Sequence, residues 1–407
     1  MRARKVTQRK LAVMLLISMF IIPFAGCGEE KKKKEEETLQ VPEDTLLGYT
    51  YSEVYTPYQL GTCDVKAELV EPENNELMVT KLLAGDSDYD FMVLSSESSL
   101  AADIMRTGAY YPLNDIPEVD GLLNRYHGYL KEAATAENGD IWMIPCGVDM
   151  PYVFYHEALC EEYGLAFTDM DYLEFMERVE SLPKDGEQTF SVPYYLMTGD
   201  ITDKFDRIYG YDNMSEAETE LLRKYMEKIR AYDVPFHEGK WWILSSEERA
   251  YYLSRESVEN ILFEMERTYN MVLGSSMNNV IRSSSFRAVK TPDLEQGVSG
   301  PNTAMVTFLV INPNSAKLDL TLQYVSQLCE KLQKDTSLAF RQMSQGEDFS
   351  DNVLREDIYR LISEGEVKFS YPQDVVADEL WAYRNGKQEF DAMLEEIQRN
   401  IEMYRKE

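Results

Sequence analysis

The chain has few of the residues that build metal centres and hydrolytic sites. Its 407 residues include 3 histidines and 5 cysteines. It has no HExxH motif and no cysteine spacing of the metal-binding kind, which argues against a zinc site. It also has no nucleophile elbow and no Ser-x-x-Lys motif accompanied by its partner motifs. These absences argue against the common metal-dependent and serine hydrolases.

Positive charge is scarce as well. The chain contains 41 Lys and Arg against 72 Asp and Glu, which gives a formal net charge of −31. Such a chain is repelled by nucleic acid and by anionic lipid surfaces. The composition therefore argues against a nucleic-acid-binding protein and against a polybasic membrane contact. It suits a soluble exported protein.

The sequence has one long apolar run, at residues 11–25. Five basic residues and no acid lie within positions 1–10, and the small residues Ala25 and Gly26 end the segment. A basic start, a short apolar stretch and small residues before a cleavage point are typical of a secretory signal peptide. The run is too short for a comfortable membrane span. We therefore expect residues 1–26 to be removed.

Cys27 directly follows Ala25 and Gly26, which is the lipobox arrangement of bacterial lipoproteins, with Phe24 where leucine is common. The pattern predicts that Cys27 becomes a diacylated N-terminus held at a membrane face. An ordinary signal peptide with a chance cysteine is the alternative. The charged run that follows has nothing to bury, so residues 27–39 are predicted to be the lipidated end and a disordered tether.

The other cysteines are Cys63, Cys146, Cys160 and Cys329. An exported compartment permits disulfides, and Cys146 with Cys160 is the first pair to consider. Cys329 lies on the apolar face of a predicted helix, so we expect it to be a buried thiol.

A mature chain of about 380 residues exceeds one ordinary core, so two lobes are expected. We place the crossing between them in residues 138–165, NGDIWMIPCGVDMPYVFYHEALCEEYGL. One apolar run ends at Pro145 and Gly147, a second spans residues 152–155, and a short helix stops at Gly164. This order indicates a chain that leaves one sheet and enters another.

The crossing resembles that of extracellular solute-binding proteins of the maltose-binding type. In that family a dGk-y-lP turn and strand lead into an l-YN-lf---Gl strand and helix. His156 stands where the family usually has Asn, and the later P-TW-E signature is reduced to residues 168–170. A second match is NPNSAK at 312–317, which resembles the family's lInknSkn signature. The residues that match in the crossing are Gly139, Ile141, Pro145, Tyr155, Leu159, Gly164 and Leu165.

Before the crossing, the pattern predicts a strand-helix-strand unit. Residues 65–69 alternate as a strand does, 77–84 form a short helix, and 91–94 are a continuous apolar run of the buried parallel type. Ser95 and Ser96 follow the carboxyl end of that run, where ligands of open α/β sheets bind. They are therefore ligand-binding candidates. The alternative is that they cap the next helix.

Beyond the crossing, a helix is predicted to begin at the capping box Ser215-x-x-Glu218. Trp241 and Trp242 are adjacent, so they point to different faces of any element. One of them suits a ligand site, because aromatic faces stack on the apolar face of sugars. The alternative for either tryptophan is the core.

Residues 257–268 are predicted to form a helix at the family position whose side chains face the ligand cleft. The resemblance makes Glu264, Glu266 and Arg267 candidates, with solvated side chains as the alternative. Asp149 and Tyr152, in the crossing itself, complete the ligand-binding candidates.

Residues 303–312 are predicted to form a strand that returns to the first lobe, and Ser315 is predicted to cap the helix after it. Residues 346–407 are predicted to be helical. Their last part has a clean amphipathic face, which we expect to pack on the second lobe.

The resemblance covers about residues 64–345. It implies an α/β, two-lobed periplasmic-binding-protein-like fold of type II, with a multi-strand hinge. Lobe 1 would comprise residues 40–148 and 306–345, and lobe 2 residues 149–305 and 346–407. It also implies a monomeric, lipid-anchored solute-binding protein of an ABC importer, at the extracytoplasmic face of the cell membrane. Such a protein binds a small solute, commonly a sugar or oligosaccharide, uses no cofactor and delivers the solute to permease subunits.

Two other functions stay open on the sequence. A surface glycosidase would use paired carboxylates, but 72 acids bring some pairs together by chance. A binding protein with a degenerate cleft, acting as a sensor or interaction lipoprotein, fits the shortened start and the altered crossing motif. Lobe closure on adding solute would separate the binder from the sensor, and product formation would identify the enzyme.

Overall fold

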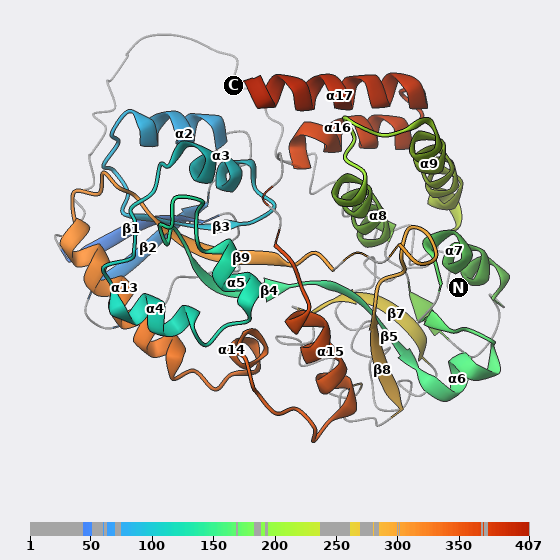
Figure 1. Cartoon of the computed structure of the whole chain (residues 1–407), viewed down its shortest axis with the longest axis horizontal. Coiled ribbons are helices and arrows are strands. Elements are labelled where there is room, and N and C mark those ends of the chain that lie inside the picture. Colours follow the sequence, from blue (N-terminus) through green and yellow to red (C-terminus); the bar gives the residue numbers. More distant parts are fainter. Residues whose placement is uncertain are drawn as a thin grey trace, which may run out of the picture. The chain divides into compact units, whose positions relative to one another are not determined.

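The strands of the computed structural model lie in two sheets (Figure 1). The described strands give a five-stranded first sheet, in the order β2-β1-β3-β9-β4, and a four-stranded second sheet, in the order β6-β7-β5-β8. We call each sheet with its helices a lobe. The structure describes residues 44–50, 60, 63–69, 75–167, 170–182, 189–191, 194–236, 261–268, 280, 285–298, 300, 302–367, 369 and 373–406.

The first sheet is mixed. β1, β2 and β3 are parallel, and β9 runs antiparallel between β3 and β4. β3 is buried at every position, and β9 at every position after its first, as expected for continuous apolar runs. The predicted strand-helix-strand unit is confirmed, with α2 (Asn75–Leu83) between β2 and β3. The strands are β1 (Thr45–Thr50), β2 (Asp64–Leu69), β3 (Phe91–Ser95), β9 (Met305–Ile311) and β4 (Ile144–Asp149).

β4 continues past the point where the sequence predicts that the first sheet ends. Its register with β9 shifts between Pro145 and Gly147, so Cys146 is the extra residue of a β-bulge. Pro145 has no N–H to donate, and its carbonyl accepts a hydrogen bond from the Tyr126 hydroxyl at 3.2 Å. The strand thereby reaches Asp149, so the break we predicted at Pro145 and Gly147 is a bulge inside the strand.

The second sheet contains β7 where the sequence predicts a helix over 257–268, and that prediction is wrong for the described part of the range. Glu, Met and Arg favour helices. However, Glu264 and Glu266 alternate with Phe263 and Met265, which is the period of a strand. Pairing with β5 and β6 then decides the outcome. The strands are β6 (Thr189–Ser191), β7 (Ile261–Arg267), β5 (Pro151–His156) and β8 (Phe286–Lys290).

Helices cover both faces of the first sheet (Figure 1). α2 and α3 (Ser99–Thr107) lie on one face, and α4 (Pro117–Leu123) and α13 (Leu318–Gln333) on the other. Tyr324 and Leu328 of α13 are buried in the same hydrophobic cluster as β3 and β9. The shorter helices α5 (Gly128–Ala133) and α14 (Leu338–Met343) complete this part.

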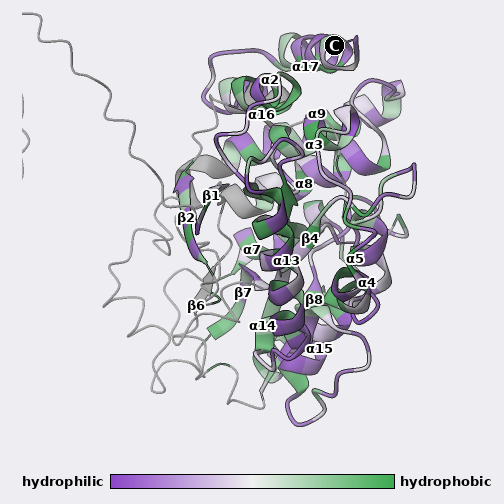
Figure 2. Ribbon diagram, turned by 90° about the vertical axis from the view of Figure 1, so that its left-hand side faces the viewer, coloured by the Kyte–Doolittle hydropathy of each residue, from purple (hydrophilic) through white to green (hydrophobic). Residues whose placement is uncertain are grey.

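The described helices of the second lobe gather on one face of its sheet. α7, α9 and α17 share a hydrophobic cluster with Val153, Phe263 and Met265 of the strands. The predicted C-terminal amphipathic face is confirmed, because Met393, Ile397 and Ile401 of α17 are buried in this cluster. Figure 2 shows the matching alternation of hydropathy along α17. The helices are α6 (Glu157–Glu162), α7 (Tyr172–Ser181), α8 (Tyr194–Ile208), α9 (Glu216–Phe236), α16 (Gln373–Arg384) and α17 (Phe390–Lys406).

α15 (Val353–Ser363) packs elsewhere than the other C-terminal helices. It contacts β8, on the side of the second sheet away from α17. Its residues Leu354 and Ile358 belong to a hydrophobic cluster that contains strands of both sheets, and α15 also contacts α14 of the first lobe. Arg287 on β8 holds α15 through a bidentate pair with Asp357, with nitrogen–oxygen distances of 2.7 and 3.1 Å. α15 therefore packs against both lobes.

The capping box at the start of α9 is confirmed. The Ser215 amide donates to the Glu218 carboxylate, and the Glu218 amide donates to the Ser215 hydroxyl at 3.3 Å. By contrast, Ser315 does not cap α13. It lies two residues before the N-cap Lys317 and donates to Asp90 Oδ1 at 2.5 Å, while Asp90 Oδ2 accepts from the Leu47 amide. The NPNSAK motif thus fastens β1 and β3 at the edge where β9 ends.

The four cysteines of the described residues are free thiols. Cys146 lies in β4 of the first sheet and Cys160 in α6 of the second lobe, so the disulfide considered for them is not formed. Burial raises the pKa of the Cys160 thiol to about 12. Cys329 is fully buried, as expected. Among the described residues, no helix is long and apolar enough to cross a membrane.

Candidate functional site

The strand directions bring the carboxyl ends of both sheets to one place. β4 runs parallel to β1, β2 and β3, so these four strands end at the same edge of the first sheet. In the second sheet β6, β7 and β8 end where β5 begins. Met150 alone separates the end of β4 from the start of β5. The two edges that carry carboxyl ends therefore meet at Met150, and such edges are where α/β sheets bind ligands.

Three chain segments run side by side at this junction. Asp149 of β4 pairs with Met305 of β9. Asn302 donates its side-chain amide to the Pro151 carbonyl at 3.3 Å. Its backbone carbonyl accepts from the Glu366 amide at 3.2 Å. These hydrogen bonds link the first crossing, the return to β9 and the segment after α15 into the multi-strand hinge that the sequence predicts.

The third hinge segment packs closely on the first at Gly365. A Cβ at this position would lie 2.6 Å from Met150 Cε and 3.1 Å from the Tyr129 ring. A larger residue would therefore displace the end of the Met150 side chain.

Arg267 links the two lobes at the junction. It is the last residue of β7, and its Nε donates to Asp149 Oδ2, the last residue of β4, at 2.6 Å. Its Nη2 lies 3.6 Å from Oε1 of Glu97, in the loop after β3. Carboxyl ends of three strands, two from the first sheet and one from the second, thus converge on one guanidinium.

Thr268 fixes the position of Asp149. Its hydroxyl donates to Asp149 Oδ1 at 3.4 Å and accepts from the Met150 amide at 3.0 Å, while the Thr268 amide donates to the Met150 carbonyl at 3.0 Å. Because Asp149 is held from both sides, Arg267 meets a carboxylate whose orientation is already set.

The charged groups at the junction shift one another's pKa values. Burial alone would lower the pKa of Arg267, but the carboxylates of Asp149 and Glu97 outweigh it and raise that pKa, so the guanidinium stays charged. Desolvation raises the pKa of Glu97. Arg267 opposes this rise, whereas the negative charges of Asp203 and Asp149 add to it.

A second ion-pair chain lies beside the first. Asp203 on α8 accepts a hydrogen bond from the Thr303 hydroxyl and pairs with Arg207 at 3.2 Å. Arg207 also lies 3.7 Å from the carboxylate of Glu366 in the third hinge segment. α8 is thereby tied to two of the three hinge segments, and the negative charge of Asp203 helps to raise the pKa of Glu97.

Two glutamates of β7 are buried rather than solvated. By register, Glu264 and Glu266 lie opposite Phe154 and Tyr152 of β5, so all four side chains share one face of the second sheet. Glu264 is 1% and Glu266 5% exposed. The Tyr152 hydroxyl is buried without a hydrogen-bond partner within the described structure. Desolvation, followed by Glu266 and Glu264, raises the pKa of Tyr152, which remains a neutral donor.

The hydroxyls of the two serine candidates accept hydrogen bonds from backbone amides. Ser95 Oγ accepts from the Glu97 amide at 3.2 Å, and Ser96 Oγ accepts from the Val306 amide of β9 at 2.9 Å. Both serines are buried. Neither caps α3, whose N-cap is Ser98. Their position at the carboxyl end of β3 is as predicted, and they shape the loop that presents Glu97.

Three of the predicted residues lie outside the described part of the chain. These are the ligand-binding candidates Trp241 and Trp242 and the lipidation candidate Cys27. Among the described residues, no group of three or more His, Cys, Asp or Glu side chains is arranged to hold a metal ion.

No family model and no curated protein matches the sequence. Solved structures do match the fold. A ribitol complex of an ABC-transporter solute-binding protein from Agrobacterium radiobacter K84 is 13% identical, with a TM-score of 0.61 over 89% of this chain and 100% of that one. The maltose-bound MalE3 protein of T. maritima is 14% identical, with a TM-score of 0.60 over 88% and 100%. A D-mannitol-bound solute-binding protein from Agrobacterium vitis S4 is 15% identical, with a TM-score of 0.58 over 89% and 98%.

The chain has the two-lobed fold of ABC-transporter solute-binding proteins. The α/β fold predicted from the sequence is thereby confirmed. Within this solute-binding-protein fold, the interlobe junction joins Asp149 and Arg267 of the predicted residues. Tyr152 and Glu266 lie next to it in the second sheet, and Glu264 lies further along β7. Sequence reasoning missed Glu97, Asp203 and Thr268. Glu97 had a signal, because it directly follows the two serines that were chosen for their place after β3.

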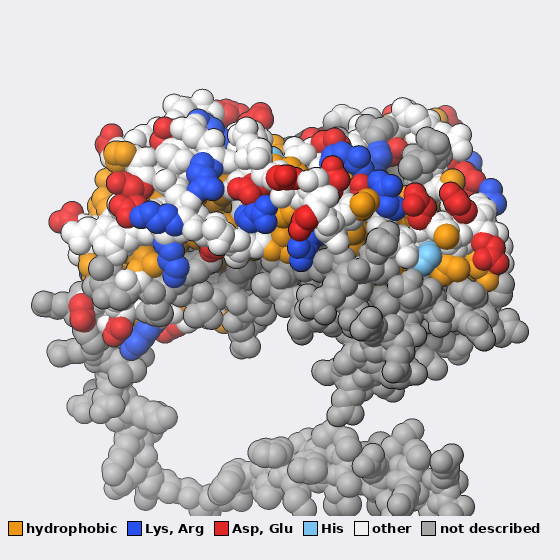
Figure 3. Space-filling view, turned by 90° about the horizontal axis from the view of Figure 1, so that it is seen from below, with side chains coloured by type: hydrophobic (Ala, Val, Ile, Leu, Met, Phe, Trp, Pro, Cys, Tyr) orange, Lys and Arg blue, Asp and Glu red, His pale blue; other side chains and the backbone are white. Residues whose placement is uncertain are grey.

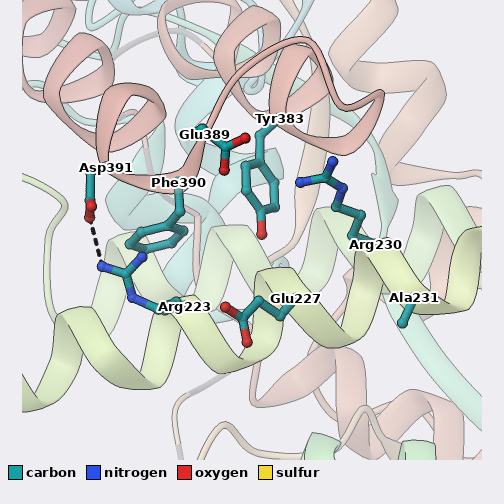
Figure 4. A pocket seen from close by; sticks show the side chains of 8 residues that line it. All are labelled: Arg223, Glu227, Arg230, Ala231, Tyr383, Glu389, Phe390 and Asp391. Atoms are coloured by element: carbon teal, nitrogen blue, oxygen red, sulfur yellow. Dashed lines mark hydrogen bonds and ion pairs between the residues drawn. The ribbon is translucent and has the colours of Figure 1, made fainter.

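A pocket also lies away from the junction of this solute-binding-protein fold. It has a volume of about 400 Å³ and lies between α9 and the turn that joins α16 to α17 (Figure 4). Arg223 lies over the Phe390 ring at 4.2 Å and pairs with Asp391 at 2.6 Å, and Arg230 lies 5.3 Å from the Tyr383 ring. Each arginine is already engaged by an aromatic ring of the pocket wall. The pocket is therefore a weaker candidate than the junction.

Proposed function

We propose that this chain is a solute-binding protein of an ABC importer, which binds a sugar, polyol or oligosaccharide between its two lobes. The observation that carries the proposal is the convergence of Asp149, Glu97 and Arg267 where the strand ends of both sheets meet. Ribitol, D-mannitol and maltose are bound in solved structures of the same fold.

The chemistry of the junction suits hydroxyl-rich solutes. Carboxylates accept hydrogen bonds from sugar hydroxyls, and a guanidinium donates to their oxygens from a rigid planar fork. Glu97 and Arg267 come from different lobes, so a solute held by both stabilises the arrangement in which the lobes are close. This is binding without chemical conversion, and we propose no catalytic step.

The address and partner of the chain are part of the proposal. Residues 1–26 act as a signal peptide, and Cys27 carries the lipid that holds the protein at the extracytoplasmic face of the cell membrane. The protein works as a monomer and passes its solute to the transmembrane subunits of a permease. The surface seen in Figure 3 is compatible with a soluble lobe pair, because Lys and Arg side chains are interspersed there with Asp and Glu among the described residues.

A thermal-shift and calorimetric screen tests this function. The full chain with Cys27→Ser is mixed with maltose, maltotetraose, D-mannitol, ribitol and D-tagatose. A solute at 100 times its dissociation constant stabilises the protein by about 2.7 kcal/mol, and Arg267→Ala should reduce that shift to half or less. The absence of a shift with every sugar and polyol would contradict the proposal and favour the sensor function.

A further inference from the structure

A second contact between the lobes lies away from the solute site, at the C-terminal end of α17. The Tyr404 hydroxyl donates to Oδ1 of Asp103 on α3 at 3.1 Å. Nη2 of Arg106, one turn further along α3, also donates to Asp103 Oδ1 at 3.1 Å. The Arg106 guanidinium carbon lies 5.4 Å from the centre of the Tyr404 ring, within cation–π range. We call these three residues the Tyr404 clasp.

The two sides of the clasp lie in different lobes. α17 is fixed in the second lobe, because Met393, Ile397 and Ile401 are each 0% exposed in that lobe's hydrophobic cluster. α3 is fixed in the first lobe through Leu100 and Ile104, which are buried with β3 and β9. Figure 1 shows the C-terminal end of α17 on the side of the first lobe that carries α2 and α3.

α3 also connects the clasp to the solute site. It begins at Ser99, directly after the loop that presents Glu97 to Arg267, and Asp103 lies one turn further on. This part of the chain therefore meets the second lobe twice, through Glu97 in the loop before α3 and through Asp103 and Arg106 within α3. A rotation about the hinge that separates the lobes has to change these contacts together, since α3 moves as one body with the first sheet.

We propose that the Tyr404 clasp is a positioning contact that stabilises the interlobe arrangement of this structure and thereby raises the affinity for solute. The affinity part rests on the proposed function, because only a conformation that places both lobes at the solute binds it fully. Affinity for a ligand falls in proportion to the fraction of protein in the competent conformation. The clasp acts on that fraction without touching the solute.

An interlobe distance measurement tests the clasp without any ligand. Spin labels are placed at Lys334→Cys in the first lobe, where the side chain is 76% exposed, and at the exposed Glu161→Cys in the second. The full chain carries Cys27→Ser, and a labelled chain without the introduced cysteines controls for the native thiols. Pulsed electron spin resonance then gives the distribution of interlobe distances in the wild type and in each clasp variant.

We expect one main distance in the wild type, equal to that of the present arrangement. Tyr404→Ala and Asp103→Ala should each lower the population at this distance, relative to the populations at other distances, by roughly fivefold. This is the effect of about one net hydrogen bond. The double variant should shift it no further, because both changes remove one contact. Tyr404→Phe keeps the ring beside Arg106 and should have a smaller effect.

Met403→Ala is the matched control, because Met403 lies in the same turn and is 55% exposed. It should leave the distances unchanged. A wild-type distribution without the present distance, or a Tyr404→Ala distribution equal to that of the wild type, would overturn the proposal. Near-ultraviolet circular dichroism confirms that each variant is folded.

The sugar that responds in the screen above is then titrated against the variants, and a roughly fivefold weaker affinity is expected for Tyr404→Ala. An unchanged affinity despite shifted distances would overturn the affinity part of the clasp. If no sugar or polyol binds, the proposed function fails while the distance measurement still decides whether the clasp positions the lobes.

Discussion

The two lobes contribute to the junction in different ways. The first sheet brings an apolar body, with β3 fully buried, and serines whose hydroxyls are already bonded to the backbone. The second sheet brings charge along a strand, since β7 holds the buried Glu264 and Glu266 and ends at Arg267. The first lobe thus joins a large apolar core to the two carboxylates Asp149 and Glu97, whereas the second contributes the guanidinium of Arg267 and buried charge along β7. Core changes in the first lobe should therefore lower stability, and charge changes in the second should lower affinity.

The largest expected effect is a loss of stability when a buried side chain of the first lobe is removed. Trp142 is 0% exposed, packs edge-on against Phe308 and Phe369, and donates its indole N–H to the Ala133 carbonyl at 3.0 Å. Trp142→Ala should lower the free energy of unfolding by about 3–5 kcal/mol, measured by urea unfolding.

Trp381→Ala is the control for that experiment. Trp381 is 53% exposed on α16 of the second lobe, so its loss should change stability by less than about 0.5 kcal/mol. If both tryptophan variants lost the same stability, the contrast between a buried and an exposed ring would be wrong.

The next effect separates affinity from stability within the second sheet. Arg267→Ala leaves Asp149, which is buried, without its closest cation. We expect a loss of about 1.5–3 kcal/mol in the free energy of unfolding, the range for hydrogen bonds to charged groups. Sugar affinity should fall at least tenfold, because one lobe loses its donor. Calorimetry and urea unfolding of the same variant measure both quantities.

Arg287→Ala is matched to that change. Arg287 also pairs with a buried aspartate, Asp357, at 2.7 Å, but it lies opposite Tyr155, toward the end of β8 that is farther from the junction. A similar loss of stability with unchanged sugar affinity is expected. A comparable drop in affinity for Arg287→Ala would show that charge anywhere on the sheet suffices, which contradicts the assigned role of Arg267.

A smaller effect compares helix starts in the two lobes. Ser215 caps α9 of the second lobe through its hydroxyl, whereas Ser98 at the N-cap of α3 makes no side-chain cap bond. Ser215→Ala should therefore cost about 1 kcal/mol of stability and Ser98→Ala much less. Thermal unfolding of the two variants side by side is the measurement. Equal losses of stability would mean that the hydrogen bonds of the capping box do not stabilise α9.

The smallest expected effect is the pH dependence of folding stability that Glu97 causes. Its pKa is raised above the ordinary 4.5 by desolvation, so the folded protein holds this proton more tightly than the unfolded chain does. Glu97 therefore makes stability fall as pH rises from about 4.5 through its folded pKa. The side chain is 37% exposed, so the slope is shallow. Glu97→Gln should flatten this part of the stability–pH curve, and an unchanged curve would contradict the desolvation of Glu97.

The same contrast between the lobes explains what could be predicted from the sequence. β3 and β9 are continuous apolar runs, and the capping box of α9 is local, so both follow from neighbouring residues. β7 does not, because its Glu, Met and Arg favour a helix until pairing with β5 and β6 buries them. A local sequence pattern predicts a strand or helix correctly when all its side chains prefer one environment. A strand with charged residues, such as β7, cannot be predicted without knowing the strands it pairs with.

The candidate site was predictable in part for the same reason. Asp149 and Arg267 were chosen by their place in the crossing and in the family pattern, and the structure joins them at 2.6 Å. Glu97, which completes the cross-lobe pair, comes from a loop far away in the chain, and no local pattern links it to Arg267. The predicted helix cap at Ser315 was wrong because Ser315 lies two residues before the N-cap Lys317. Its hydroxyl accepts from the Lys317 amide and donates to Asp90.

The place of β9 in the first sheet has a consequence for how the chain reaches its native state. β9 lies between β3 and β4, so neither β3 nor β4 has its partner on that side until β9 is present. Phe91, for example, pairs with Ile311. The first lobe cannot close its sheet until most of the polypeptide has been synthesised. Such distant pairing is slow to form. The first sheet of this chain therefore forms late, after residues 305–311 have been synthesised.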